Sequence, residues 1–502
     1  MTPSLKALLV ILALLLPTLL IGLGSRPVYK IQEVRIAETA REMIASGNWD
    51  MPHYNGELRL QKPPLPYWLT AASYEIGGID ETTTRLPAVL FSLLTAMLLF
   101  TWVQRETGIK AAANTALVLT ASYIGIRYGR SGEADAILLF FISAACLIGY
   151  QVFLHGGNKG LQTLFGLALG LGFLSKGPAA LAIPLLTLLG YGWMEKRLGA
   201  FKQCFSLTGI VLLLVTAFGW YAWLVWKRPD AVHYFVTKQV DETFVSGTHA
   251  KPAWWYPPHI LEFFAPWGFL LIPAGWAAYR SRETSSLPAH VKFAWIWLAV
   301  VFVLLTATIN KQMQYALLFA PPLAVILGYY LTSTHGRFAG VNQGLFYLFT
   351  AIAAMGVGYI LVKAGISAAL WLLLPLLPLL LHRVLRTDIS APVLFVAGIA
   401  AMTYLYSDEQ LSKEPRKVAA QTVLTAAGNA APLYQSAPGD GALSFYAHRV
   451  IPPVKNEALQ TLVQKTGTVW LITHVAPTVP GSMVDVVAEA DELKLCRLQH
   501  KP

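Results

Sequence analysis

The stretch TTTRLPAVLFSLLTAMLLFTWV, residues 82–103, holds a single charged side chain, that of Arg85. A helix of about 20 apolar residues crosses the hydrocarbon core of a bilayer. Runs of this kind recur along most of the 502-residue chain, which is 55% hydrophobic and only 13% charged. A soluble globular protein carries about 25% charged residues. The sequence therefore predicts an all-α polytopic membrane protein.

The same length rule, applied outward from this stretch, predicts about thirteen spans. The first apolar run follows a lone Lys6 and has no A-x-A cleavage site, so we expect a retained helix rather than a removed signal peptide. The predicted spans are 5–24, 82–103, 110–126, 134–154, 161–175, 178–194, 205–226, 260–279, 291–309, 313–333, 338–362, 366–382 and 389–407.

The basic residues indicate the orientation of the chain. With a cytoplasmic N-terminus, every short connection on the inner side holds at least one Lys or Arg, as the positive-inside rule requires. The loops 25–81 and 227–259 and the C-terminal tail then lie outside, together with most of the acidic residues. We therefore expect the chemistry of the protein on its outer face.

The charge and the cysteines exclude several classes of function. The net charge of +11 comes from bases scattered between hydrophobic spans, a pattern that sets topology and contacts anionic lipids. Membrane lipids are therefore expected partners, and nucleic acid is not. Cys146, Cys204 and Cys496 share no metal-ligand or short-loop spacing, which argues against a disulfide framework and a zinc–thiolate site.

Two domains are expected. Residues 1–407 would form the transmembrane domain, including both outer loops, and residues 408–502 a small α/β domain outside the membrane. The tail lacks a nucleotide-binding glycine fingerprint. Its patterns predict helices at 418–427 and 458–465 and strands at 442–446 and 469–473.

The loop 25–81 opens with a helical pattern. Apolar residues recur at helical spacing from Ile31 to Ile44, and Gly47 is a natural C-terminal stop. We expect a helix that lies along the membrane surface.

Five motifs follow one another along the chain and carry a family resemblance. Together, over about residues 25–335, they resemble the aminoarabinose transferase and protein O-mannosyltransferase group of GT-C membrane glycosyltransferases. The motifs are QEVRIAETAREMIASGNWDMPHYNGELRLQKPPLPYWLTAA (32–72), RYGRSGEADAILLFF (127–141), FLSKGPAALAIPLL (173–186), THAKPAWWYPPHILEFFAPW (248–267) and NKQMQYALLFAPPLAVILGYYL (310–331).

The resemblance implies a GT-C fold and an inverting sugar transfer from an undecaprenyl-phosphate donor at the periplasmic face of a bacterial inner membrane. Its most specific version is transfer of 4-amino-4-deoxy-L-arabinose to lipid A phosphate. A mannosyl- or hexosyltransferase that acts on a protein or glycan hydroxyl is the alternative enzyme. A transporter of lipid-linked sugars and an inactive scaffold that binds lipid carriers are the non-enzymatic alternatives.

Such a transfer needs particular side chains. The leaving group is a lipid phosphate, whose charge must be neutralised by Lys, Arg or backbone N–H groups. A hydroxyl acceptor also needs a carboxylate base, whereas a phosphate acceptor is already ionised. A nearby carboxylate further stabilises an oxocarbenium-like transition state.

Glu33 and Lys62 are the predicted catalytic residues, and we expect them to meet in one cavity above the bilayer. In the group that the chain resembles, an acidic pair opens this helix, but the first position here is Gln32. Gln32 is therefore assigned to substrate binding and Glu33 to catalysis. The alternative is that Glu33 only pairs with Lys30 or Arg41 on a wet surface helix.

Lys62 matches the Lys-Pro motif of the group, where a cation meets phosphate; a lysine that snorkels to the headgroups is the alternative. Where the aminoarabinose branch often has Glu, this chain has Gln61, a poor ligand for a transition metal. No metal ligands are therefore assigned, although a divalent cation stays open as a cofactor. His249 is assigned to substrate binding only.

Further substrate-binding residues come from the other motifs. Asp135 lies just inside a span, where it either contacts substrate or forms a structural ion pair with Arg130. Lys176 stands in Ser-Lys-Gly-Pro, which would either cradle a phosphate or form a tight turn whose Lys faces the headgroups. The remaining candidates are Arg41, Arg85, Arg130, Lys311 and Tyr315.

Overall fold

The computed structural model describes residues 16, 19–20, 22–60, 62–231, 250–265, 267–284, 287–333, 417–428 and 432–501. The chain divides into two compact units. The helical unit comprises Met1–Ile21, Gln61–Leu65 and Pro87–Leu405, and the mixed unit comprises Gly22–Leu60, Pro66–Leu86 and Tyr406–Pro502. The predicted division at residue 407 stays a prediction.

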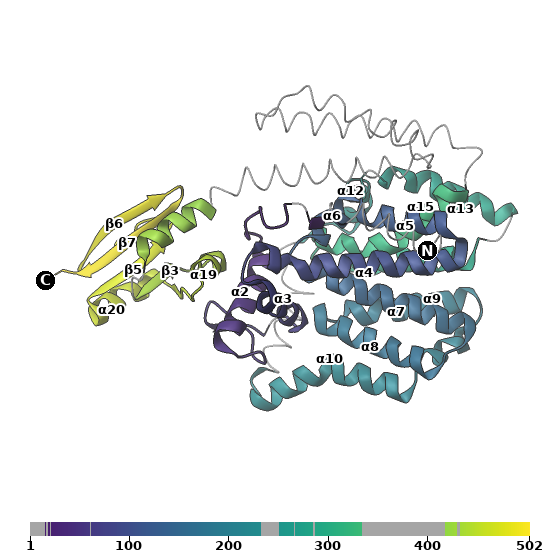
Figure 1. The fold of residues 1–502 in the computed structure, drawn as a ribbon, viewed down its shortest axis with the longest axis horizontal. Coiled ribbons are helices and arrows are strands. Elements are labelled where there is room, and N and C mark those ends of the chain that lie inside the picture. The colour runs from purple at the N-terminus through teal and green to yellow at the C-terminus, as the bar shows by residue number, and fades with distance from the viewer. Residues whose placement is uncertain are drawn as a thin grey trace, which may run out of the picture. The chain divides into compact units, whose positions relative to one another are not determined.

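Apolar helices make up the described part of the helical unit (Figure 1). In its interior, α7 packs against α8 and α9, α8 against α10, α9 against α14, and α5 against α15. Its elements are α4 (Glu81–Thr107, from Pro87 on), α5 (Ile109–Thr120), α6 (Tyr123–Gly129), α7 (Asp135–His155), α8 (Lys159–Lys176), α9 (Ala179–Met194), η1 (Leu198–Cys204), α10 (Leu207–Lys227), η3 (Ala253–Trp255), α12 (Tyr256–Phe263), η4 (Gly268–Leu270), α13 (Leu271–Thr284), α14 (Ala289–Ala307), η5 (Met313–Phe319) and α15 (Ala320–Ser333).

Several of these helices can cross a membrane. Among the described residues, five are long and apolar enough, or up to seven if two bent helix pairs each count as one span. The predicted spans 338–362, 366–382 and 389–407 lie outside the described residues. The chain is thus a mostly helical, multi-pass membrane protein, and the number thirteen stays a prediction.

Two predicted spans are broken rather than continuous. The span 110–126 is wrong as one helix, because α5 and α6 meet at a bend of 66°. Ser122 caps α6 by accepting from the Gly125 N–H, and a Cβ on Gly125 would lie 2.2 Å from the Leu119 oxygen. The span 260–279 is likewise divided into α12, η4 and α13. The mean hydropathy of about 20 residues does not detect a short turn within the window, so both segments are predicted as continuous spans.

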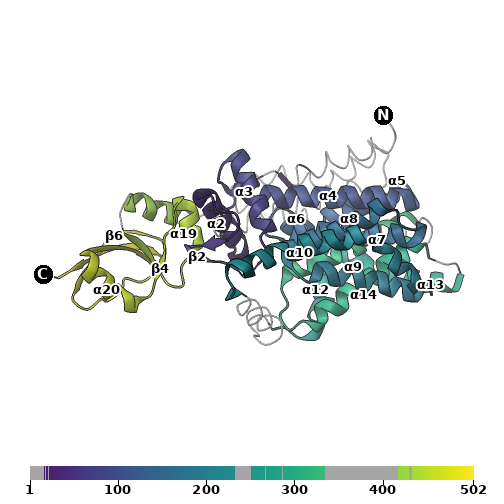
Figure 2. The same cartoon turned by 90° about the horizontal axis from the view of Figure 1, so that it is seen from below.

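The mixed unit combines helices with a five-stranded sheet of order β4-β3-β5-β7-β6 (Figure 2). β3 runs parallel to β4 and β5, whereas β7 runs antiparallel to β5 and β6. Its elements are α2 (Ile31–Ser46), β1 (His53–Tyr54), β2 (Glu57–Leu58), α3 (Leu65–Gly77, from Pro66 on), a helix at 417–427, β3 (Leu433–Ser436), α19 (Gly441–Ala447), β4 (Pro453–Val454), α20 (Asn456–Thr466), β5 (Thr468–Thr473), β6 (Ser482–Ala490) and β7 (Leu493–His500).

The predicted tail elements are confirmed with one exception. The helices at 418–427 and 458–465 and the strand at 469–473 correspond to described elements. The predicted strand at 442–446 is wrong, because this segment is helix α19. Asp440 caps α19 by accepting from the Ala442 N–H, and a short apolar run alone does not distinguish strand from helix.

Helix α2 confirms the pattern read from the sequence. It ends at Ser46, and Gly47 follows in the left-handed region with φ of 67°. An apolar cluster joins Val34 and Ala37 of α2 to Tyr74 of α3 and Phe445 of α19. The charged residues Glu33, Glu38, Arg41 and Glu42 of α2 are also buried, so α2 is not a wet surface helix.

Candidate active site

Glu33 lies in the first turn of α2 and is fully buried. Its carboxylate accepts hydrogen bonds from Arg85 Nε at 2.7 Å and Arg85 Nη2 at 3.1 Å. Arg26 Nη2 lies 3.9 Å from Glu33 Oε1. Arg85, a residue that the sequence placed only among the substrate contacts, is therefore a buried partner of Glu33, and Arg26 is buried beside them.

Arg85 uses the rest of its guanidinium to hold the backbone that precedes α2. Its Nη1 donates to the carbonyls of Leu23 at 2.6 Å and Arg26 at 2.8 Å, and its Nη2 donates to the carbonyl of Pro27 at 3.1 Å. A guanidinium has five N–H donors, and all five of Arg85 are used in these hydrogen bonds. The Glu33–Arg85 pair thus ties α2 to the segment 23–27.

Arg41 forms a second buried ion pair, with Glu38. Its guanidinium donates to both Glu38 carboxylate oxygens at 2.7 Å. Burial raises the pKa of Glu38 to about 8, although Arg41 acts in the opposite direction. Gln32, the residue before Glu33, is half-buried.

Three predicted residues of the helical unit come together. Asp135 is the first residue of α7, and Lys176 is the last residue of α8. Lys176 Nζ donates to both Asp135 carboxylate oxygens at 2.6 Å and lies 5.4 Å from the centre of the Tyr315 ring. The side chains of Lys176 and Asp135 are 20% and 6% exposed, respectively. This cluster, Asp135–Lys176–Tyr315, is therefore within reach of an anionic ligand.

The Ser-Lys-Gly-Pro motif explains how Lys176 reaches this place. Gly177 ends α8 with φ of 94°, a conformation that glycine adopts without strain. Pro178 then caps α9, which begins at Ala179. The predicted span 178–194 therefore agrees with α9 to within one residue at its start.

Lys311 lies in the turn between α14 and η5 and is buried. Its ammonium group donates to the backbone carbonyls of Thr306, at 3.2 Å, and Thr308. Burial lowers the pKa of Lys311. Arg130 follows α6 and is also buried.

Lys62 belongs to the helical unit and is half-buried, followed by buried Pro63 and Pro64. Glu33 belongs to the mixed unit, so their convergence in one cavity stays a prediction. Gln61 and His249 lie outside the described residues. Within the described ranges, no group of three or more His, Cys, Asp or Glu side chains is placed to hold a metal ion.

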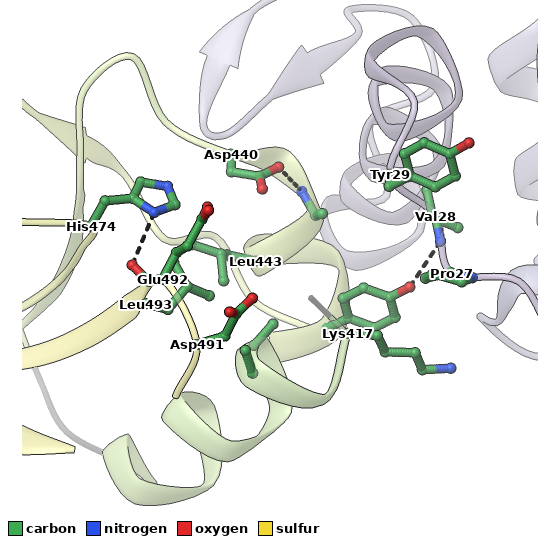
Figure 3. Close-up of a pocket in the computed structure, with 14 residues that line it drawn as sticks. Pro27, Val28, Tyr29, Lys417, Asp440, Leu443, His474, Asp491, Glu492 and Leu493 are labelled. Atoms are coloured by element: carbon green, nitrogen blue, oxygen red, sulfur yellow. Dashed lines mark hydrogen bonds between the residues drawn. The ribbon is translucent and has the colours of Figure 1, made fainter. Parts of the chain in front are cut away.

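The mixed unit contains a pocket of about 250 Å³ (Figure 3). Its walls come from the segment Pro27–Tyr29, the helix at 417–427, α19, and the loops around His474 and Asp491. None of the predicted site residues lines it. Lys417 and Tyr446, which do line it, were missed by sequence reasoning, because nothing local in the tail indicates a partner in loop 25–81.

Comparison with known proteins shows the fold. The profile of the dolichyl-phosphate-mannose-protein mannosyltransferase family matches residues 61–223. The chain resembles the crystal structure of ArnT from Cupriavidus metallidurans bound to undecaprenyl phosphate, with a TM-score of 0.83, 20% identity and 97% of each chain covered. The apo structure of the same protein gives a TM-score of 0.81 at 21% identity, covering 99% of this chain and 98% of that one.

The sequence relatives agree with the structural match. The undecaprenyl phosphate-α-4-amino-4-deoxy-L-arabinose arabinosyl transferase 2 of Sodalis glossinidius is 29% identical over 360 residues, covering 69% of this chain and 64% of the relative. The corresponding transferase of Edwardsiella ictaluri is 29% identical over 346 residues, covering 67% of this chain and 62% of the relative. The chain thus spans somewhat less than two thirds of the length of these relatives.

Proposed function

We propose that the chain is a GT-C membrane glycosyltransferase of the aminoarabinose transferase and protein O-mannosyltransferase group, and that it transfers one sugar from undecaprenyl phosphate to an acceptor at the periplasmic face. The specific form of the proposal is transfer of 4-amino-4-deoxy-L-arabinose to a phosphate of lipid A. The names of the relatives support the donor and the sugar.

The observation that carries the proposal is the Asp135–Lys176–Tyr315 cluster. The ammonium group of Lys176 is held by a carboxylate, and the Lys176 side chain as a whole is 20% exposed. A phosphate that reaches this side chain can share its ammonium group with Asp135. Lys176 would then neutralise the charge that develops on the departing lipid phosphate.

The chemical step balances without a cofactor. An oxygen of the acceptor forms a bond to the anomeric carbon of the sugar, while the bond from that carbon to the phosphate oxygen of the donor breaks. The leaving undecaprenyl phosphate takes the electron pair, and attack from the opposite face inverts the configuration. Lys62 is proposed as a second cation for phosphate, and Glu33 as the carboxylate that stabilises positive charge on the sugar.

The Glu33–Arg85 geometry favours a phosphate acceptor over a hydroxyl. A hydroxyl acceptor requires a base that is available to take its proton. Both carboxylate oxygens of Glu33 already accept from Arg85, so this residue is poorly placed for that task. A phosphate acceptor is ionised and needs no base, which ranks hexosyl transfer to a hydroxyl second.

The cellular setting is part of the proposal. The protein would reside in the inner membrane, with its N-terminus in the cytoplasm and the tail in the periplasm, as the distribution of Lys and Arg requires. A divalent cation stays open as a cofactor and has to be tested. The argument against a metal site is that Gln61 is a poor ligand for a transition metal, and both Gln61 and His249 lie outside the described residues.

Reconstitution would test the function directly. The full chain in lipid vesicles is supplied with undecaprenyl-phosphate aminoarabinose, labelled in the sugar, and with lipid A. Labelled lipid A is the expected product, and the Lys62→Ala variant should not form it. Movement of the donor across the bilayer without transfer would instead identify a transporter, and retention of the donor without either would identify a scaffold.

A further inference from the structure

The C-terminal tail holds the segment that precedes α2. The Val28 N–H donates to the Tyr446 hydroxyl at 2.9 Å, and that hydroxyl donates to Glu81 Oε1 at 3.3 Å. Lys417 pairs with the same Glu81 oxygen, and its ammonium lies 5.5 Å from the centre of the Tyr446 ring. We call these four residues, Val28, Glu81, Lys417 and Tyr446, the latch.

The latch lies directly beside the contacts of Arg85. Glu81 and Arg85 are four residues apart on α4, and residues at this spacing share one face of a helix. Arg85 binds the carbonyl of Pro27, and Tyr446 binds the N–H of the next residue, Val28. The segment 23–28 is therefore held from both sides, and Arg85 in turn holds Glu33.

We propose that Tyr446 and Lys417 are positioning residues for the Glu33–Arg85 pair, and that they act through Val28 and Glu81. The inference deepens the proposed function, on which it rests, because Glu33 is assigned there to the reaction. Val28 is buried, so loss of the tyrosine hydroxyl leaves its N–H without this acceptor. The segment can then shift, and small displacements of a catalytic group reduce the rate strongly.

The latch can be altered at a residue that is not fully buried. Tyr446 is only half-buried, and Lys417 and Val28 border the pocket together with it (Figure 3). The Tyr446→Phe variant keeps the ring and removes the hydroxyl alone. Tyr434→Phe is the matched control, because Tyr434 is a half-buried tyrosine of strand β3 that takes no part in the latch.

The experiment combines kinetics with hydrogen exchange on the full chain in vesicles. Because the hydroxyl joins two hydrogen bonds, we expect Tyr446→Phe to lower kcat about tenfold, with KM for the lipid donor within about twofold. Amide exchange in a peptide that spans residues 26–34 should accelerate about tenfold, while the melting temperature changes little. Tyr434→Phe should match the wild type in every measurement.

A second variant separates positioning from general damage. Tyr446 and Glu81 are joined by a hydrogen bond and are proposed to position the same segment. Adding Tyr446→Phe to Glu81→Gln should therefore lower kcat no further than the worse of the two single changes. Wild-type kcat or wild-type exchange in Tyr446→Phe would overturn the proposal, as would additive losses in the double variant. If the wild type transfers no sugar, the proposed function fails; exchange, which needs no substrate, then shows separately whether Tyr446 holds the segment.

Discussion

Two ion pairs, one in each compact unit, differ in how completely they are buried. Both side chains of Glu33–Arg85 are 0% exposed, whereas those of Asp135–Lys176 are 6% and 20% exposed. Arg85 also donates to three backbone carbonyls, but Lys176 has an aromatic face beside it. The Glu33–Arg85 pair therefore holds segments of the fold together. In the Asp135–Lys176 pair, Lys176 can instead bind an anionic ligand.

This contrast predicts different losses of stability for substitutions in the two pairs. Removing one member of a buried pair leaves the other charged and unpaired, which costs about 3–5 kcal/mol. The Asp135 and Lys176 side chains are less completely buried, so the corresponding cost is smaller. Substitutions in the two pairs should therefore give different combinations of lost activity and lost stability.

The largest effect is expected for Glu33→Gln. This change leaves the buried Arg85 without its counter-charge, so it should abolish transfer and also lower the free energy of unfolding by about 3–5 kcal/mol. Thermal unfolding of the purified protein and the vesicle assay would measure both. Wild-type thermal stability of this variant would show that the Glu33–Arg85 pair does not stabilise the fold.

Lys176→Ala is expected to reduce activity strongly, with a smaller loss of stability than Glu33→Gln. Removing one donor to a developing anionic charge typically lowers the rate by about 10²–10³-fold. Lys159→Ala is the matched control, because Lys159 is an exposed lysine at the other end of the same helix. If the control loses as much activity, the assignment of Lys176 is wrong.

Tyr315→Leu tests the contact between Tyr315 and Lys176, and its expected effect on activity is smaller than that of Lys176→Ala. The cation–π contact with Lys176 is worth about 0.5–1 kcal/mol where it is exposed, so its loss should raise KM for the lipid donor about two- to fivefold. Steady-state kinetics would measure the change. In the background of Lys176→Ala, the same substitution should have no further effect on KM, and an added loss would contradict the contact.

Glu38 gives the mixed unit a pH dependence of stability. Its pKa is raised from 4.5 to about 8 by burial. The stability that this shift contributes is therefore present below the unfolded value and is lost as the pH rises through the folded one. Between about pH 4.5 and pH 8, the melting temperature of the wild type should fall more steeply than that of Glu38→Gln.

Glu57→Gln provides the control for the pH experiment, because Glu57 is exposed in the hairpin that follows α2. Its melting temperature should follow the wild-type slope. Equal slopes for Glu38→Gln and the wild type would mean that Glu38 does not titrate in this range.

Sequence reasoning succeeded where the signal is local. The helix from Ile31, its end at Gly47 and the start of α9 after Pro178 follow from residues within one or two turns of each other. It failed at the break between α5 and α6 and at α19, where a serine or aspartate cap outweighs the apolar pattern. Such caps involve one side chain, which an average over about 20 residues does not detect.

The sequence by itself determined that the chain is a helical membrane protein, and its motifs in order carried the resemblance to the GT-C glycosyltransferases. Only the tertiary structure decided which charges are paired. Glu33 and Arg85 are 52 residues apart, Asp135 and Lys176 are 41 apart, and Val28 and Tyr446 are 418 apart. Hydropathy and helical period are properties of near neighbours, whereas the partner of a buried charge is set by how distant segments pack.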